Sequence, residues 1–119
     1  MERFMKGDIV VVNFPFSDLT ESKKRPALIL KKISGTDLIL CQITSNSYQS
    51  SEEVIITNDF LSKGKLKKHS YVRFTKLFTA DTSLIQYKLG KVNNNKLTEI
   101  LNKLNEYLIS DQNEIPQTY

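Results

Sequence analysis

The sequence predicts a mainly β protein with a C-terminal α-helix, folded as a small, strongly curved β-barrel with the helix packed across it. Short apolar runs, five or more in number, are separated by clusters of polar, glycine or proline residues, as strands are. Helical periodicity is confined to the end of the chain. A length of 119 residues suits one ordinary domain, which we expect to span residues 1–109.

The first predicted strand is Asp8–Phe14, a β-branched apolar run. Ten residues follow, Pro15–Lys24, and this connection is longer than a hairpin turn requires. Long connections in compact domains are often functional. Arg25 and Pro26 then begin the second strand, Ala27–Leu30, where a proline is tolerated because it lies at the strand start.

The turn cluster Ser34–Asp37 predicts a hairpin whose return strand is Leu38–Thr44. Pairing through this turn places Thr44 opposite about position 27 of the preceding strand. We therefore expect Thr44 and Arg25 to lie near each other at one end of the hairpin.

The middle of the chain predicts shorter elements. A polar loop, Ser45–Glu52, leads to a short strand. Asn58–His69 is expected to contain one turn of helix or 3₁₀ helix. The expected extended pieces and the final turn are Val54–Thr57, Tyr71–Phe74, a segment within Phe78–Gln86, and a turn over Leu89–Val92.

The last element is an amphipathic helix over about residues 95–109, because leucine and isoleucine recur at steps of three and four from Leu97 to Leu108. Asn93–Asn95 offers side chains that can cap its first turn. Residues 110–119 are polar, contain Pro116, and predict a flexible tail.

The composition excludes several classes of protein. A single cysteine, Cys41, is incompatible with an internal disulfide framework or a multi-cysteine zinc site, and its apolar strand predicts a buried, inert thiol. One histidine leaves no His-rich metal site. The sequence has no apolar run of membrane-spanning length and no signal-peptide pattern at its start. We expect a cytoplasmic protein without a metal or other cofactor.

Charge is distributed unevenly. The net charge is +4, and residues 22–36 and 60–80 together carry many cations and no acid. Two such segments can merge into one surface that attracts a polyanion, or they can be solvated loops that keep the protein soluble.

The strongest candidate site is the end of the predicted hairpin. The guanidinium of Arg25, held beside a proline, offers a planar fork of donors to phosphate oxygens. It could equally form an ion pair with Asp8, Asp18 or Glu21. The small polar residues Thr44–Ser47 could bind phosphate or base edges, or could simply cap a turn.

These residues also carry a family resemblance. The chain resembles the MazF/PemK family of toxin endoribonucleases, and in particular its PemK-like branch. The motifs that carry the resemblance occur in the family's order and spacing over most of the chain: Gly7–Val10, Arg25–Leu30, Ile43–Ser45, Ser70–Arg73 and Thr79–Asp81.

The resemblance implies an SH3-like barrel of the MazF, Kid and CcdB type, a homodimer, and metal-independent, sequence-dependent cleavage of single-stranded RNA. It also implies a cognate antitoxin that covers the RNA groove. Carried over by position, Arg25 and Thr44 match the family's catalytic residues. The residues expected to bind RNA are Lys23, Lys24, Ser45, Asn46, Arg73 and Thr75. Thr75 occupies a position where some relatives carry an acid.

Cleavage by the RNA's own 2′-OH requires a proton acceptor and cationic stabilisation of the pentacoordinate phosphorane. Arg25 can supply the cation. For the acceptor, a water, Asp18, Glu21 and His69 all remain candidates. Further phosphate contacts are expected from Lys65, Lys67 and Lys68, and base stacking from Phe16 or Tyr48, whereas we expect Phe78 to lie in the core.

Two other functions are compatible with such a barrel. One is a gyrase-directed toxin of the CcdB type, although residues 110–119 carry few of the apolar anchors which that activity uses. The other is a barrel that binds nucleic acid or protein without turnover.

Overall fold

The computed structural model describes residues 3–15 and 22–111. Seven strands form one antiparallel sheet in the order β4-β6-β3-β2-β1-β7-β5. The strands are β1 (Asp8–Pro15), β2 (Ser22–Lys32), β3 (Asp37–Thr44), β4 (Glu53–Ile56), β5 (Leu61–Gly64), β6 (Ser70–Asp81) and β7 (Ile85–Val92). Within the described residues, the remaining elements are two 3₁₀ helices, η1 (Asn58–Phe60) and η2 (Thr82–Leu84), and one α-helix, α1 (Asn94–Ile109). The predicted fold class, mainly β with a C-terminal α-helix, is confirmed.

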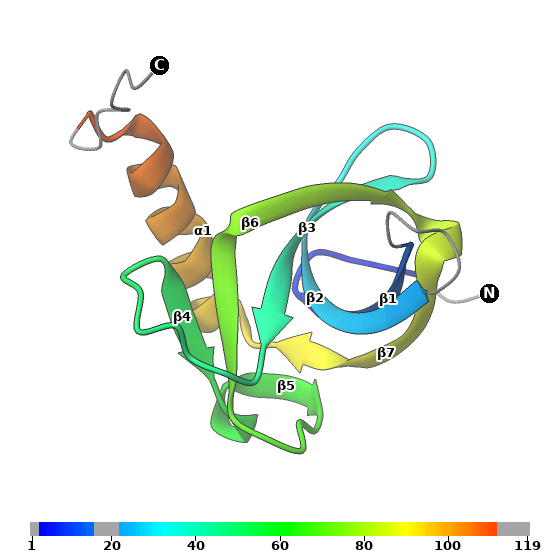
Figure 1. Cartoon of the computed structure of the whole chain (residues 1–119), viewed down its shortest axis with the longest axis horizontal. Helices are drawn as coiled ribbons and strands as arrows, with labels where there is room; N and C mark the ends of the chain where they lie inside the picture. Colours follow the sequence, from blue (N-terminus) through cyan, green and yellow to red (C-terminus); the bar gives the residue numbers. More distant parts are fainter. Residues whose placement is uncertain (1–2, 16–21, 112–119) are drawn as a thin grey trace.

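The sheet curls into a barrel, and α1 lies along one side of it against β6 (Figure 1). Its two edge strands, β4 and β5, follow each other in the chain and are separated only by Thr57 and η1. Irregularities in the β3–β6 and β1–β7 pairings allow the strong bend.

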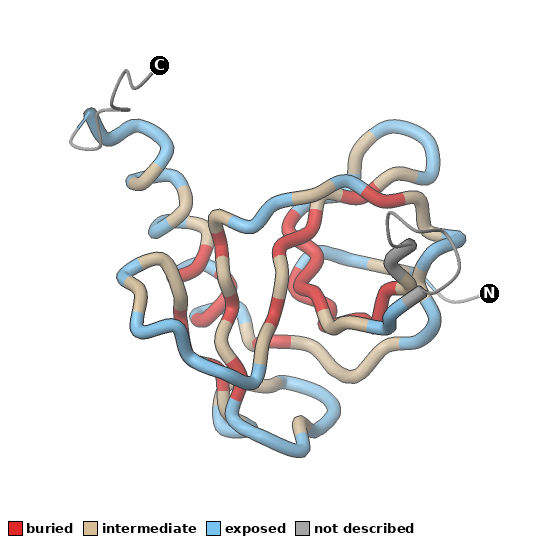
Figure 2. Tube along the Cα trace, in the orientation of Figure 1, coloured by how far each residue is buried: buried red, intermediate tan, exposed pale blue. Residues whose placement is uncertain are grey.

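Both faces of the central strands are buried. Ile9 and Leu28 belong to a core that also includes Leu97 and Ile100 of α1. Their neighbours Val10 and Ile29 point to a second core on the opposite face. Figure 2 shows the buried segments of these strands in the middle of the molecule. The unbroken apolar runs in β1 and β2 are therefore explained by burial on both sides.

The helix α1 is fixed at its start. The Asn93 side chain accepts a hydrogen bond from the Lys96 amide at 2.8 Å, as the sequence predicts for a capping asparagine. The Asn93 amide donates to the Phe60 carbonyl at 2.8 Å, and the Lys96 ammonium lies 3.9 Å from the centre of the Phe60 ring. These contacts tie the helix to η1, which joins the two edges of the sheet.

Several expected boundaries were wrong. Strand β2 begins at Ser22, because Lys23 pairs with Phe14 across the hairpin, so only residues 16–21 separate the strands. The expected turn at Leu89–Val92 is strand, since Gly90 there makes room for β5 to pass closely. Strand β5 was not expected, and β6 is one long strand rather than two short pieces.

Residues 112–119 of the expected flexible tail lie outside the described residues. In the part of the chain that the structure describes, no helix combines the length and apolar character needed to cross a membrane.

Candidate functional site

Strand register brings Arg25 and Thr44 to the same face of the sheet. The β2–β3 ladder runs through Leu28–Cys41 to its last pair, Ala27–Gln42. Two residues further along each strand, side chains return to the same face, so Arg25 and Thr44 occupy opposing positions where the ladder ends. The expected partner of Thr44, position 27, was wrong by two residues, and the observed register brings it closer to Arg25.

The same face continues across two more strands. Gln42 pairs with Arg73, and Arg73 pairs on its other side with Glu53. Thr44 pairs with Tyr71 in the neighbouring row. We call this surface the open face, because all of its side chains are exposed or half-buried: Arg25, Gln42, Thr44, Glu53, Ile55, Tyr71 and Arg73.

The hydroxyl of Thr44 has a defined orientation. Its Oγ1 accepts a hydrogen bond from the backbone amide of Asn46 at 3.2 Å. A hydroxyl that accepts in this way keeps its proton available to donate. The turn-capping role considered for Thr44 is therefore real, and it is compatible with binding a phosphate oxygen.

Arg73 is held by an aromatic ring. Its guanidinium carbon lies 4.1 Å from the centre of the Tyr48 ring, an arrangement that fixes the plane of the cation. Tyr48 remains largely exposed. The β3–β4 loop thus folds back over the sheet and presents a flat cation and a ring side by side.

Glu53 anchors this loop, a role that no local pattern in the sequence indicates directly. Its carboxylate accepts hydrogen bonds from the Ser47 hydroxyl and from the Tyr48 amide, the latter at 3.2 Å. These bonds, the Ser47 hydroxyl foremost, hold the pKa of Glu53 below its ordinary value. Glu53 is therefore ionised and already engaged at neutral pH. Val54 is buried, so alternation along the strand places the neighbouring Glu53 on the opposite side. With the β4–β6 pairing known, that side is the open face, because Glu53 pairs with Arg73.

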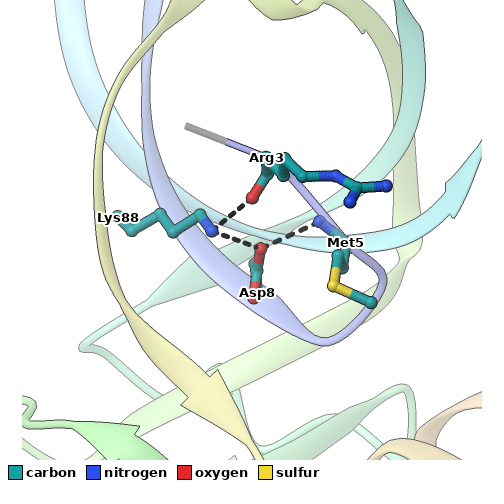
Figure 3. A network of polar contacts seen from close by, with 4 residues as sticks. All are labelled: Arg3, Met5, Asp8 and Lys88. Carbon is teal, nitrogen blue, oxygen red and sulfur yellow. Dashed lines mark hydrogen bonds and ion pairs between the residues drawn. The ribbon is translucent and has the colours of Figure 1, made fainter. Parts of the chain in front are cut away.

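Asp8 is not the partner of Arg25. Its carboxylate accepts from the Met5 amide at 2.9 Å and lies 3.3 Å from the Lys88 ammonium, which also donates to the Arg3 carbonyl (Figure 3). Asp18 and Glu21, the other two expected partners, lie outside the described residues, as does Phe16.

The remaining expected RNA-binding residues are divided between surfaces. Lys23 is exposed near the start of β2. It lies two residues before Arg25, so its side chain is on the open face. Lys24 and Ser45 line a pocket on the opposite face. Asn46 is exposed just beyond Thr44.

Thr75 lies two residues beyond Arg73 on β6, and its hydroxyl is engaged in a hydrogen bond. Its hydroxyl donates to Glu52 at 3.0 Å, and the other Glu52 oxygen accepts from the hydroxyl of Tyr107 in α1 at 3.3 Å. The side chain of Thr75 thus connects the sheet to the helix through Glu52.

Three further expectations concern single side chains. His69 is exposed and precedes Tyr71, the cross-strand partner of Thr44, by two residues. Phe78 packs against the second core, as expected. Cys41 is fully buried, and burial raises the pKa of its thiol to about 12, which confirms the prediction of an inert cysteine.

Comparison with known families agrees with this fold. Residues 5–108 match the family model described as PemK-like, MazF-like toxin of type II toxin-antitoxin systems. The chain belongs to this family. No curated protein matches the chain.

Solved structures with the same fold include the MazE–MazF complex of Deinococcus radiodurans, at 21% identity and a TM-score of 0.72, covering 92% of this chain and 100% of that chain. A MazF toxin of Mycobacterium tuberculosis is 18% identical with a TM-score of 0.67, covering 87% and 98%. An endoribonuclease in complex with its cognate antitoxin, from a mycobacterial species, is 15% identical with a TM-score of 0.70, covering 89% and 95%.

Proposed function

We propose that this protein is the toxin of a type II toxin–antitoxin pair and an endoribonuclease that cleaves single-stranded RNA, without a metal and in a sequence-dependent manner. The observation that carries the proposal is the placement of Arg25 opposite Thr44 on the open face, where the β2–β3 ladder ends. A cation and a hydroxyl at opposing strand positions suit one phosphodiester group.

Chemistry follows from what RNA supplies. The 2′-oxygen attacks the adjacent phosphorus, the bond from phosphorus to the 5′-oxygen breaks, and the products are a 2′,3′-cyclic phosphate and a 5′-hydroxyl. Arg25 stabilises the charge that develops on the phosphorane oxygens, and Thr44 donates a hydrogen bond to one of them. The leaving 5′-oxygen takes its proton from solvent.

His69 is assigned as the acceptor of the 2′-OH proton. It is exposed and lies two residues from the partner of Thr44, and histidine is the side chain that ordinarily exchanges a proton near neutral pH. Glu53 is a weaker choice because Ser47 and Tyr48 already occupy its oxygens. As the acceptor, His69 would take the 2′-OH proton on an unprotonated ring nitrogen.

The family also supports two partners. We propose that the chain works as a homodimer and is inhibited by a cognate antitoxin. The net charge of +4 favours an acidic antitoxin segment as well as RNA. Light scattering on the purified protein tests the dimer.

The decisive experiment incubates purified protein with a mixed-sequence single-stranded RNA in the presence of EDTA. Arg25→Ala and Thr44→Val should each lower kcat by roughly 100-fold or more, as loss of an oxyanion donor does, while Thr44→Ser keeps most activity because it keeps the hydroxyl. Lys31→Ala, on the same strand but at its far end, is the matched control and should cleave like the wild type.

Two outcomes would reject this function. Full cleavage by Arg25→Ala would remove the proposed site, and binding without cleavage by the wild type would favour the non-catalytic barrel. His69→Gln should lower kcat without changing KM. An unchanged kcat in that variant would return the proton acceptor to a water or to a residue of the β1–β2 connection.

A further inference from the structure

A pocket of about 440 Å³ lies on the other side of the same strand ends. Residues that alternate with the catalytic pair form part of its wall: Lys24 precedes Arg25, and Ser45 follows Thr44. The pocket and the Arg25–Thr44 pair are therefore on opposite faces, separated only by the end of the β2–β3 ladder.

The lining of this pocket combines three chemistries. Its floor is apolar, formed by Val11, Pro26, Ile43, Leu66 and Leu89. Tyr87, whose exposed fraction is 48%, contributes an accessible ring. Four lysines (Lys24, Lys65, Lys67 and Lys68) and the hydroxyls of Ser45 and Ser70 complete it. None of the described residues that line the pocket is acidic.

The wall that carries three of these lysines is held in place. The side-chain amide of Asn58 accepts from the Leu66 amide at 2.7 Å and donates to the Leu66 carbonyl at 3.2 Å. The Ser70 hydroxyl donates to the Lys68 carbonyl at 3.1 Å, and Ser70 is buried. The pocket is thus formed by ordered backbone rather than by free lysine chains alone.

We propose that this pocket binds one nucleotide flanking the scissile bond, and so determines which base the enzyme prefers there. This inference rests on the proposed ribonuclease function. An aromatic ring and an apolar floor suit the two faces of a base, the hydroxyls suit its edge, and the lysines suit the adjoining phosphates. Its volume lies in the range of small-ligand pockets, roughly 300–1,000 Å³.

Continuity with the open face favours RNA over an acidic peptide. A strand whose phosphate lies at Arg25 and Thr44 needs only to pass over the end of the ladder to reach Lys24 and Ser45, the adjacent residues of the same two strands. An acidic peptide would use the lysines but would leave the exposed ring of Tyr87 without a planar partner.

The test measures binding separately from cleavage. The probe is a fluorescein-labelled 2′-O-methyl oligoribonucleotide of eight uridines, or of eight adenosines, which cannot be cleaved because its 2′-oxygens are blocked. Tyr87→Ala and the double variant Lys67→Ala/Lys68→Ala should weaken binding about tenfold or more. Tyr87→Phe keeps the ring and should bind like the wild type. The double variant Lys31→Ala/Lys32→Ala is the charge-matched control and should change affinity less than twofold.

A second readout concerns specificity. Sequencing of cleavage ends from a random RNA pool should show a base preference next to the cut in the wild type and in Tyr87→Phe, and a relaxed preference in Tyr87→Ala. For Lys67→Ala/Lys68→Ala, the slope of log affinity against log salt should fall by roughly 0.7 per lost phosphate contact.

The outcomes separate the two proposals. Wild-type affinity and wild-type base preference in all pocket variants would overturn the nucleotide pocket while leaving the ribonuclease intact. Loss of probe binding in the pocket variants supports the pocket even if the wild type fails to cleave. Should an acidic leucine-containing peptide bind the wild type but not Lys67→Ala/Lys68→Ala, with probe binding unchanged in both, the pocket is a peptide site and the proposal is wrong.

Discussion

Thr44 performs two roles with one hydroxyl. Its oxygen accepts the Asn46 amide, which fixes the direction of the side chain, and its proton remains for a ligand. A structural turn and a binding group are therefore the same residue. The small polar residues at a strand end were ambiguous in the sequence because both roles use the same atoms.

Some site residues could be found from local patterns and others could not. Arg25 and Thr44 belong to one hairpin, whose turn cluster is visible in the sequence, so their proximity was predictable to within two residues. Glu53 and Arg73 meet through the β4–β6 pairing, which joins segments that no turn signal connects. Phe16, Asp18 and Glu21, which the sequence indicates as candidate site residues, lie outside the described residues.

Asp81 gives a prediction at the residue scale. Hydrogen bonds from Ser83, and then from the Thr36 hydroxyl, lower the pKa of its carboxyl to about 2. Because the folded-state pKa lies below the unfolded one, Asp81 stabilises the fold at pH values above roughly 3.9 and loses this effect as pH falls toward 2.

Carboxyl carbon NMR should place the titration midpoint of Asp81 near 2 in the wild type. Ser83→Ala and Thr36→Val should each raise it toward the ordinary value of roughly 3.9. Thr79→Ala, exposed on the same strand, should leave it unchanged. A midpoint near 4 in the wild type would contradict these contacts.

At the scale of elements, the long apolar strands were predictable and the short polar strand β5 was not. Asp8–Pro15 and Asp37–Thr44 carry apolar side chains on both faces or in alternation, which local sequence records. Strand β5 spans four residues, none of them buried, so its pairing with β7 leaves no hydrophobic signal. The sequence pattern around Gly90 predicts a turn. In the structure Gly90 instead lets β5 pass close to β7, where a side chain would not fit.

Gly90 therefore carries the element-scale prediction. A Cβ at this position would lie 2.4 Å from the Lys63 carbonyl oxygen, so Gly90→Ala must push β5 away from β7. We expect a loss of about 1–3 kcal/mol in the free energy of unfolding, as overpacking costs, measured by urea denaturation. Gln86→Ala, exposed on the same strand, is the control and should cost under roughly 0.5 kcal/mol.

The same variant links structure to the pocket. Strand β5 leads directly into Lys65–Lys68, so its displacement should also weaken binding of the uridine probe. Unchanged stability together with unchanged binding in Gly90→Ala would show that β5 does not need the close approach.

At the scale of the whole molecule, α1 completes the first core. Ile100 is fully buried among strand residues such as Ile9 and Val72. Ile100→Ala should lower the free energy of unfolding by about 2–5 kcal/mol through lost burial and the cavity left behind. Lys103→Ala, exposed on the same helix, should stay within roughly 0.5 kcal/mol. Equal stability of the two variants would mean that the helix is not part of the cooperative unit.

The sequence predicts the fold class, a curved β-barrel with a helix, but not the arrangement of its strands. A late amphipathic helix and many short strands indicate a barrel, but the order of strands and the juxtaposition of β4 and β5 through η1 depend on contacts between distant parts of the chain. The basic segments 22–36 and 60–80 do converge, since Lys24 and Lys65–Lys68 line one pocket. From the sequence alone, these two segments could form one positive surface or two separate solvated loops.

Alternation along β2 and β3 has a consequence for how such a chain can change. Deleting one residue just before Thr44 would turn its hydroxyl to the pocket side and bring Ser45 to the open side, so a shift of one step would exchange the two surfaces. Substitutions at these strand ends can adjust chemistry gradually, whereas insertions and deletions there rewrite both surfaces at once. Length variation among descendants of this chain should therefore accumulate in its loops and spare these two strand ends.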